Sequence, residues 1–249
     1  WFAVALEFVI VVAGVVIGFQ ITEWRGHQAR LAQTASLTER LRDDMNAEAW
    51  RVAANRAYLR DVVVAGRTAL EAMRDDRVAD EILVINAFRA SQYYWNGLNR
   101  ATYDELVATG TIDLVDDAAL RTAAVEYFSS PEDALITRIP DTTPYRDRFR
   151  QIAPAALHRQ LVTDCGEDRM ISTGEFEGLT DFLSFPCAID GFEAEIAALA
   201  TALRNDPGLA ELLNWRIIEA DQQFVGNYWF AVILNRGTNA PPPDAEPAP

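Results

Sequence analysis

The two cysteines and two histidines are the residues best suited to metal binding or nucleophilic chemistry. Cys165 and Cys187 belong to no C-x-x-C pair, and His27 and His158 lie in different parts of the chain. A zinc site needs about four suitably spaced ligands, so no metal site is predicted. The cysteines could close a loop of about 23 residues, a constraint worth roughly 3 kcal/mol. The sequence leaves this disulfide and two free buried thiols both open.

The sequence contains none of the common catalytic signatures. G-x-S-x-G, H-E-x-x-H, a P-loop and G-x-G-x-x-G are all absent. The 37 acidic residues are abundant, but acid–base catalysis needs two carboxylates placed in one cleft with separated pKa values. We therefore predict a protein that is not an enzyme and needs no cofactor.

An aromatic cluster, Tyr93, Tyr94 and Trp95, is the candidate for a ligand or partner surface. Large aromatic side chains more commonly pack in a core with their polar tips near water. The sequence is compatible with both roles.

The first 22 residues are almost wholly apolar, whereas the rest of the chain is polar and acidic. A helix of that length rises about 33 Å, enough to cross a hydrocarbon core of about 30 Å. Trp1 and Trp24 stand near its two ends, where indoles favour the membrane–water boundary. The segment leads into a polar stretch without a small-residue cleavage site, so it differs from a signal peptide. We predict a retained transmembrane helix, and we expect the natural N-terminus to lie before residue 1.

Three residues within the predicted span suggest contact with another helix. Gly14 and Gly18 form a G-x-x-x-G motif, which allows close helix packing in lipid but is also common there by composition alone. Glu7 is costly in the membrane unless it is protonated, paired or at the interface. A polar contact of Glu7 with a partner helix is the hypothesis, and an interfacial glutamate is its alternative.

The net charge of −15 bears on the kind of partner. Nucleic-acid affinity comes mainly from neutralising phosphates, so nucleic acid is not a predicted partner. The same acidity disfavours docking of the polar region on anionic lipid.

Helical periodicity runs through most of the remaining chain and predicts an all-α fold. The predicted organisation is a transmembrane helix at 1–22, a stalk helix at 23–75, a helical domain at 76–237 and a Pro-rich disordered tail at 238–249. Helix boundaries are marked by a capping box at Thr102 and Glu105 and by Gly110 as a C-terminal stop. Asp116 or Asp117 should cap a helix running to Phe128, and Asn205 or Asp206 should cap a last helix that runs to about residue 235.

The chain resembles a bacterial family of uncharacterised, N-terminally anchored, single-pass membrane proteins. The family's span begins with glutamate and ends in Gln-Ile-Asn-x-Trp, and a Tyr-x-Glu-Leu-x-x-x-Gly-x-Leu-x-Leu-Ile pattern follows further along. The matching residues of the span are Glu7, Gly14, Gln20, Ile21 and Trp24; those of the second pattern and the helix after it are Tyr103, Glu105, Leu106, Gly110, Leu114, Val115, Leu120 and Arg121. Departures are Ile112 for leucine and Thr22-Glu23 where the family tends to have asparagine.

The resemblance implies an architecture and an orientation rather than an activity. Family members usually carry a basic stub before the span, which places the N-terminus in the cytoplasm and the large domain in the periplasm. That stub outweighs the basic residues after the span, which taken alone would place the domain inside. These residues are Arg25, Arg30, Arg40 and Arg42. A periplasmic domain would also favour the disulfide.

The expected protein is an accessory or stabilising subunit of an inner-membrane assembly. Its predicted partners are the lipid bilayer and the helices of other membrane proteins, in a hetero-assembly or a homo-oligomer. Glu7, Gly14, Gly18, Gln20 and Trp24 are the predicted packing residues. A periplasmic sensor domain for a small ligand is the alternative.

Overall fold

The computed structural model describes residues 2–93, 98–130, 143–166, 174–176 and 182–241, with side chains from residue 14 onward. Every element of regular secondary structure within these ranges is helical. The all-α prediction is therefore confirmed.

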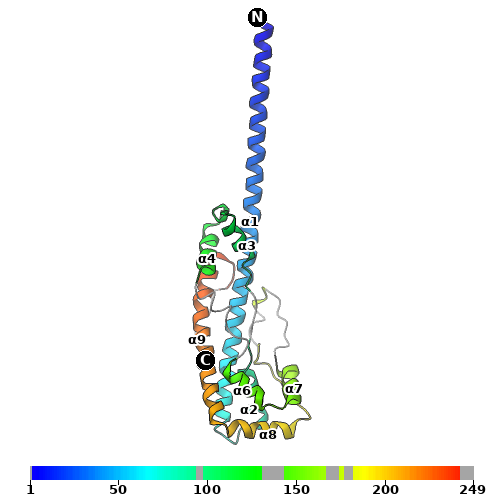
Figure 1. Cartoon of the computed structure of the whole chain (residues 1–249), viewed down its shortest axis with the longest axis vertical. Coiled ribbons are helices and arrows are strands. Elements are labelled where there is room, and N and C mark those ends of the chain that lie inside the picture. The colour runs from blue at the N-terminus through cyan, green and yellow to red at the C-terminus, as the bar shows by residue number, and fades with distance from the viewer. Residues whose placement is uncertain (1, 94–97, 131–142, 167–173, 177–181, 242–249) are drawn as a thin grey trace.

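One helix, α1 (Phe2–Ala72), organises the molecule. Its first part projects from the domain with no other element beside it (Figure 1), and residues 14–33 are exposed on every side. From Leu37 onward the same helix carries buried side chains, among them Leu41 and Met45, which are fully buried. The predicted stalk is thus partly a bare helix and partly the centre of the domain.

The other helices surround the second part of α1. They are α2 (Asp80–Ala90), α3 (Ala101–Ala108), the 3-10 turn η1 (Ile112–Leu114), α4 (Ala118–Phe128), α6 (Pro144–Ile152), α7 (Ala155–Cys165), α8 (Glu193–Arg204) and α9 (Pro207–Gly237). The long α9 runs antiparallel to α1 and makes the most extensive contact with it, while α8 crosses the end of the bundle far from the N-terminus (Figure 1).

Two hydrophobic clusters fill the bundle. The proximal core, nearer the projecting helix, joins α1 to α3, α4 and the end of α9 through residues such as Leu41, Leu106, Tyr127, Phe230 and Leu234. The distal core joins the last turns of α1 to α2, α6, α7, α8 and the first half of α9. The apolar end of α9 therefore contributes to the proximal core.

Several predicted helix boundaries are confirmed. Asp117 accepts a hydrogen bond from the backbone N–H of Leu120 at 3.0 Å and caps α4. Asp206 does the same for Leu209 at 3.1 Å and caps α9. Gly110 adopts a positive φ of 66° after α3, and the N–H of Thr111 reaches the carbonyl of Leu106 at 2.9 Å. This pairing is a Schellman stop.

The predicted capping box at Thr102 and Glu105 is wrong. Thr102 lies inside α3, whose N-cap position is Arg100 without a side-chain cap. The N–H of Thr102 donates instead to Asp44 of α1 at 3.1 Å, and Glu105 pairs with Arg40 of α1. A carboxylate from a neighbouring helix supplies the cap, and the local motif cannot reveal it.

Arginine side chains cap the C-terminal ends of several helices. Arg204 donates to the carbonyl of Ala72, the last residue of α1, at 3.4 Å. Arg216 reaches Ala90 at the end of α2 at 3.4 Å, and Arg89 reaches Cys165 at the end of α7, also at 3.4 Å. The free carbonyls of a helix end carry partial negative charge, so a guanidinium there satisfies hydrogen bonds and the helix dipole together.

Candidate functional site

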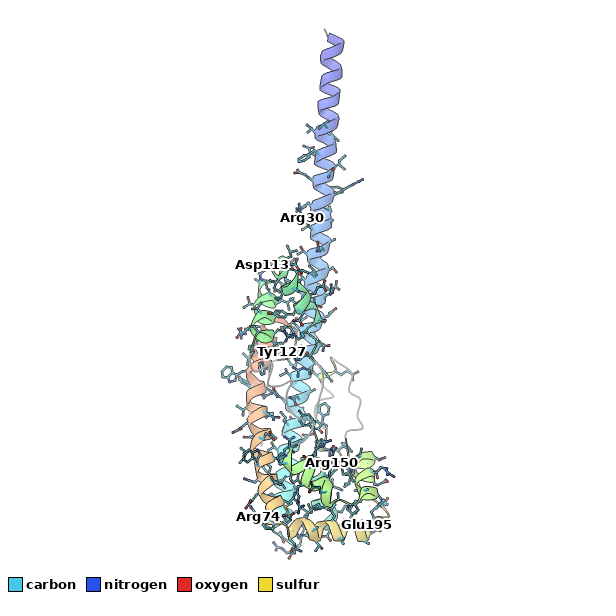
Figure 2. All side chains as sticks on the ribbon, in the orientation of Figure 1. Arg30, Arg74, Asp113, Tyr127, Arg150 and Glu195 are labelled. Carbon is cyan, nitrogen blue, oxygen red and sulfur yellow. A yellow bond between two sulfur atoms is a disulfide. The ribbon has the colours of Figure 1, made fainter. Side chains whose placement is uncertain are left out.

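The projecting part of α1 presents apolar side chains to solvent around its whole circumference. Val15, Ile17, Phe19, Ile21 and Trp24 are all exposed, and at 100° per residue they fall on different sides of the helix. Figure 2 shows Arg30 on the bare helix below them, where the polar sequence begins. A helix that is apolar all round normally lies within a membrane or among other helices.

No helix in the part of the chain that the structure describes is both long and apolar enough to span a membrane. The side chains of residues 1–13, the first half of the predicted span, lie outside that part.

The predicted helix-packing residues are exposed wherever they are described. A Cβ added at Gly14 or Gly18 would meet nothing within 4 Å, so neither glycine serves packing within this chain. Spacing places these two on one face, whereas Gln20 and Trp24 lie on another. Glu7 falls among the residues whose side chains are not described.

The aromatic cluster can be placed only in part. Tyr93 is half-buried near the end of α2, while Tyr94 and Trp95 lie outside the described residues. The ligand-surface prediction for these three residues stays a prediction.

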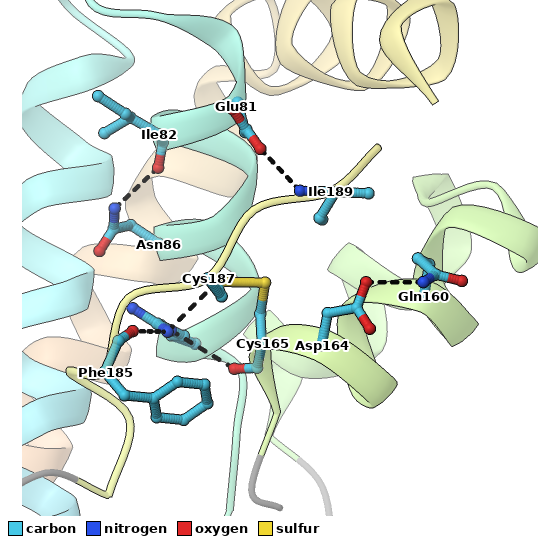
Figure 3. Close-up of a disulfide and its surroundings, with 10 residues drawn as sticks. Glu81, Ile82, Asn86, Gln160, Asp164, Cys165, Phe185, Cys187 and Ile189 are labelled. Carbon is cyan, nitrogen blue, oxygen red and sulfur yellow. Dashed lines mark hydrogen bonds between the residues drawn. A yellow bond between two sulfur atoms is a disulfide. The ribbon is translucent and has the colours of Figure 1, made fainter. Parts of the chain in front are cut away.

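Cys165 and Cys187 are joined by a disulfide with a Cα–Cα distance of 5.4 Å. The bond connects the end of α7 to the irregular segment that leads to α8 (Figure 3). Glu81 of α2 holds the same segment by accepting the N–H of Ile189 at 2.8 Å.

Arg89 of α2 lies against the disulfide. Its Nη2 donates to the carbonyl of Phe185 at 2.6 Å and contacts the Sγ of Cys187 at 3.3 Å. The guanidinium carbon also stands 4.9 Å from the centre of the Phe185 ring. Burial lowers the pKa of Arg89, although nearby Asp61 opposes that shift. These contacts hold the segment before α8 against α2.

A second buried polar group joins α1 to α4. Glu48 accepts from Arg51 Nε at 2.9 Å and from the Tyr127 hydroxyl at 2.6 Å, and its other oxygen accepts the N–H of Asn99 at 2.7 Å. Tyr127, labelled within the bundle in Figure 2, also accepts from Arg51. Burial raises the pKa of Tyr127 well above its ordinary value, so the phenol stays protonated and donates. Glu48, Arg51 and Tyr127 are thus hydrogen-bonded to one another, and the group serves to hold α1 and α4 together.

A cavity of about 200 Å³ lies between α6 and α9. It is lined by Thr143, Pro144, Tyr145, Leu212, Trp215, Arg216 and Glu219. Arg216 is buried, its Nη1 lies 3.6 Å from Glu219, and burial lowers its pKa. Ligand sites usually enclose about 300–1,000 Å³. The space is small, and Tyr93 is not among the described residues that line it.

The outer face of α9 is a surface that the sequence reasoning missed. Trp215 and Trp229 are 69% and 66% exposed, and Ile218 and Val225 between them are about half exposed. We call these four residues, together with Gln222, the α9 seam. Their spacing of three and four was visible in the sequence, but only the structure shows that these side chains stay largely exposed, with Trp215 also lining the cavity between α6 and α9.

Among the described residues, no group of histidine, cysteine and carboxylate side chains is arranged to hold a metal ion. Comparison of the chain with protein-family models, curated protein sequences and solved structures found no significant match. The resemblance to anchored bacterial proteins therefore stays a prediction, and function has to be argued from the surfaces described above.

Proposed function

We propose that this chain is a membrane-anchored helical interaction protein, an accessory or stabilising subunit of an inner-membrane assembly. The N-terminal segment would be the anchor and part of the recognition surface. The bundle would be a rigid body held at a set distance from the membrane.

The continuity of α1 carries this proposal. One helix passes without a break from an apolar, uncovered segment into the centre of both hydrophobic cores. Whatever holds the first part therefore also fixes the position of the domain, because a packed helix transmits force and orientation along its axis. Apolar side chains stabilise a structure only when they are removed from water. Val15, Ile17 and Phe19 would therefore not stabilise a helix that stayed exposed to water on all sides.

The disulfide supports a domain on the periplasmic side. Such bonds persist in oxidising compartments and are rare in the bacterial cytoplasm. A reporter fused after Gly237 should therefore be active in the periplasm. A fusion that is active only in the cytoplasm would contradict the proposed orientation.

The glycine face supports recognition of a further helix. A Cβ at Gly14 or Gly18 would have no described atom within 4 Å, so a second helix could approach closely there. Glu7 precedes Gly14 by seven residues, which places its position on the same side of an ideal helix. Small residues beside one polar group are typical of helix–helix contacts in lipid.

The anchor is tested by flotation with vesicles of phosphatidylcholine and phosphatidylglycerol. The full chain should float with the vesicles after a high-salt and carbonate wash. The variant Ile17→Asp with Phe19→Asp should remain in the dense fraction, since a charged side chain at the centre of a span costs a few kcal/mol. A wild-type chain that washes off would contradict anchoring.

The subunit role is tested by native purification in mild detergent. A stoichiometric partner should co-elute with the wild-type chain and be lost from Gly14→Leu and Gly18→Leu, while both variants still float. Gly26→Leu is the matched control, because Gly26 is equally uncovered but lies beyond the predicted span. Equal elution of all four chains without a partner would refute the subunit role.

A further inference from the structure

We infer that the α9 seam pairs in parallel with the seam of a second copy of this chain, giving a two-fold dimer of anchored protomers. The inference rests on the proposed anchor for the direction of pairing. The pairing surface itself is argued from α9 alone.

The seam has the spacing of a two-stranded coiled coil. Trp215, Gln222 and Trp229 recur every seven residues, and Ile218 and Val225 fall three residues after the first two of them. In heptad terms the first set occupies a positions and the second occupies d positions. Val232 continues the d series and is partly exposed. A regular helix therefore presents a line from Trp215 to Val232 that is apolar except at Gln222.

Residues on the two flanks of the seam are compatible with a parallel partner. In a parallel pair each g position faces the following e position of the other chain. Asn214 would face Glu219 of the second copy, and Asp221 would face Gly226. The next pair along joins Tyr228 to Ile233. None of these pairings brings two like charges together in a chain whose net charge is −15.

The surface is large enough for a modest interface. A fully exposed tryptophan presents about 250 Å², so the four apolar seam residues offer on the order of 500 Å² per chain. Complete burial of these side chains would remove about 1,000 Å² from water in total, which is about the minimum for a biological interface. Anchoring in one membrane raises the effective concentration of the two seams, which favours a contact of this size.

The two α9 helices must pair in parallel because α1 and α9 are antiparallel within each chain (Figure 1). Antiparallel pairing of the two α9 helices would point the two projecting segments in opposite directions. They could not then enter the same membrane. Parallel pairing sends both to one side, with the two-fold axis along the bundle.

The dimer leaves the glycine face of the anchor free. The seam lies opposite the face of α9 that packs on α1, where Ile217 meets Gly66 and the carbonyl of Phe224 accepts from Arg56. The order across the dimer is therefore α1, α9, α9, α1. With about 8–10 Å between neighbouring axes, the two α1 helices stand roughly 25–30 Å apart. Gly14 and Gly18 remain available to a helix of another protein.

Light scattering of the full chain in detergent tests the pairing. The protein mass should correspond to two chains for the wild type and to one chain for Ile218→Arg. Val107→Arg is the matched control, because Val107 is equally exposed on α3, away from the seam, and it should leave the mass at two chains. The circular dichroism spectrum should be equally helical for both variants, so that loss of pairing is distinguished from loss of the fold. A one-chain wild type, or an Ile218→Arg chain that still has the mass of two, would overturn the proposal.

Cysteine cross-linking under mild oxidation tests the direction. Val225→Cys should form a dimer within minutes, because identical d positions face each other only in a parallel pair. Val107→Cys should not. Failure of Val225→Cys to cross-link in a two-chain particle would overturn the parallel arrangement. The anchor and the pairing fail in different measurements. A chain that pairs but is not anchored would keep the mass of two chains in light scattering and would not float with vesicles.

Discussion

Four arginines that are largely shielded from solvent have partners of two kinds. Arg204, Arg216 and Arg89 donate to the last carbonyls of helices, whereas Arg51 pairs with the fully buried carboxylate of Glu48. A guanidinium offers five donors in a rigid fork and suits both tasks, while a lysine offers one compact charge. The use of arginine alone among the basic residues therefore has a structural consequence here.

At the scale of single residues, Arg51→Met should destabilise the fold by about 3–5 kcal/mol, because it leaves the buried Glu48 charge without its partner. Adding Glu48→Gln should recover part of that loss, since the remaining group is neutral. Urea unfolding followed by circular dichroism measures both effects. Arg77→Met is the control: its ion pair with Asp75 is exposed, and the unfolding midpoint should not move. A midpoint of Arg51→Met equal to that of the wild type would contradict the role given to this pair.

At the scale of elements, the close approach of α1 and α9 depends on one residue without a side chain. A Cβ at Gly66 would come within 2.6 Å of Ile217 Cγ1. Of the contacts between helices described here, α1 with α9 is the most extensive, so a displacement there affects both cores.

Gly66→Ala should therefore lower the melting temperature, because overpacking typically costs about 1–3 kcal/mol and exceeds the gain of about 1 kcal/mol in helix propensity. Gly26→Ala in the same helix meets nothing and should not lower it. In a double-mutant cycle, Ile217→Ala should cost less in the Gly66→Ala background than in the wild type. Additive effects would show that the two residues are not in contact.

At the scale of the whole molecule, the disulfide ties a long irregular segment to a helical bundle. It connects α7 to the segment before α8, and Arg89 and Glu81 of α2 hold that segment at further points. The constraint acts mainly on the unfolded chain, in which a cross-link removes freedom that the folded state has already lost.

Replacing both cysteines by serine should lower the free energy of unfolding by about 3 kcal/mol, as expected for a closed loop of this size. Thermal melts with and without a phosphine reductant measure the effect. The reductant should lower the melting temperature of the wild type and leave that of the double variant unchanged. A wild-type melt that is insensitive to the reductant would contradict a stabilising cross-link.

The helical fold and several helix boundaries could be predicted from the sequence, because both depend on residues that are close together in the chain. Asp117 and Asp206 cap the helices that follow them, and Gly110 takes a left-handed conformation that a side chain would oppose. The capping box at Thr102 failed because Asp44, distant in sequence, competes for the same N–H. A local motif cannot contain that information.

The sequence by itself determined an all-helical chain that begins with an apolar segment, since periodicity and composition act over neighbouring residues. Only the tertiary structure decided which apolar faces are covered. Leu234 and Trp229 lie on the same helix and are similarly hydrophobic, yet the first is fully buried and the second is two-thirds exposed. Burial depends on what packs against each face, and that is set by distant parts of the chain.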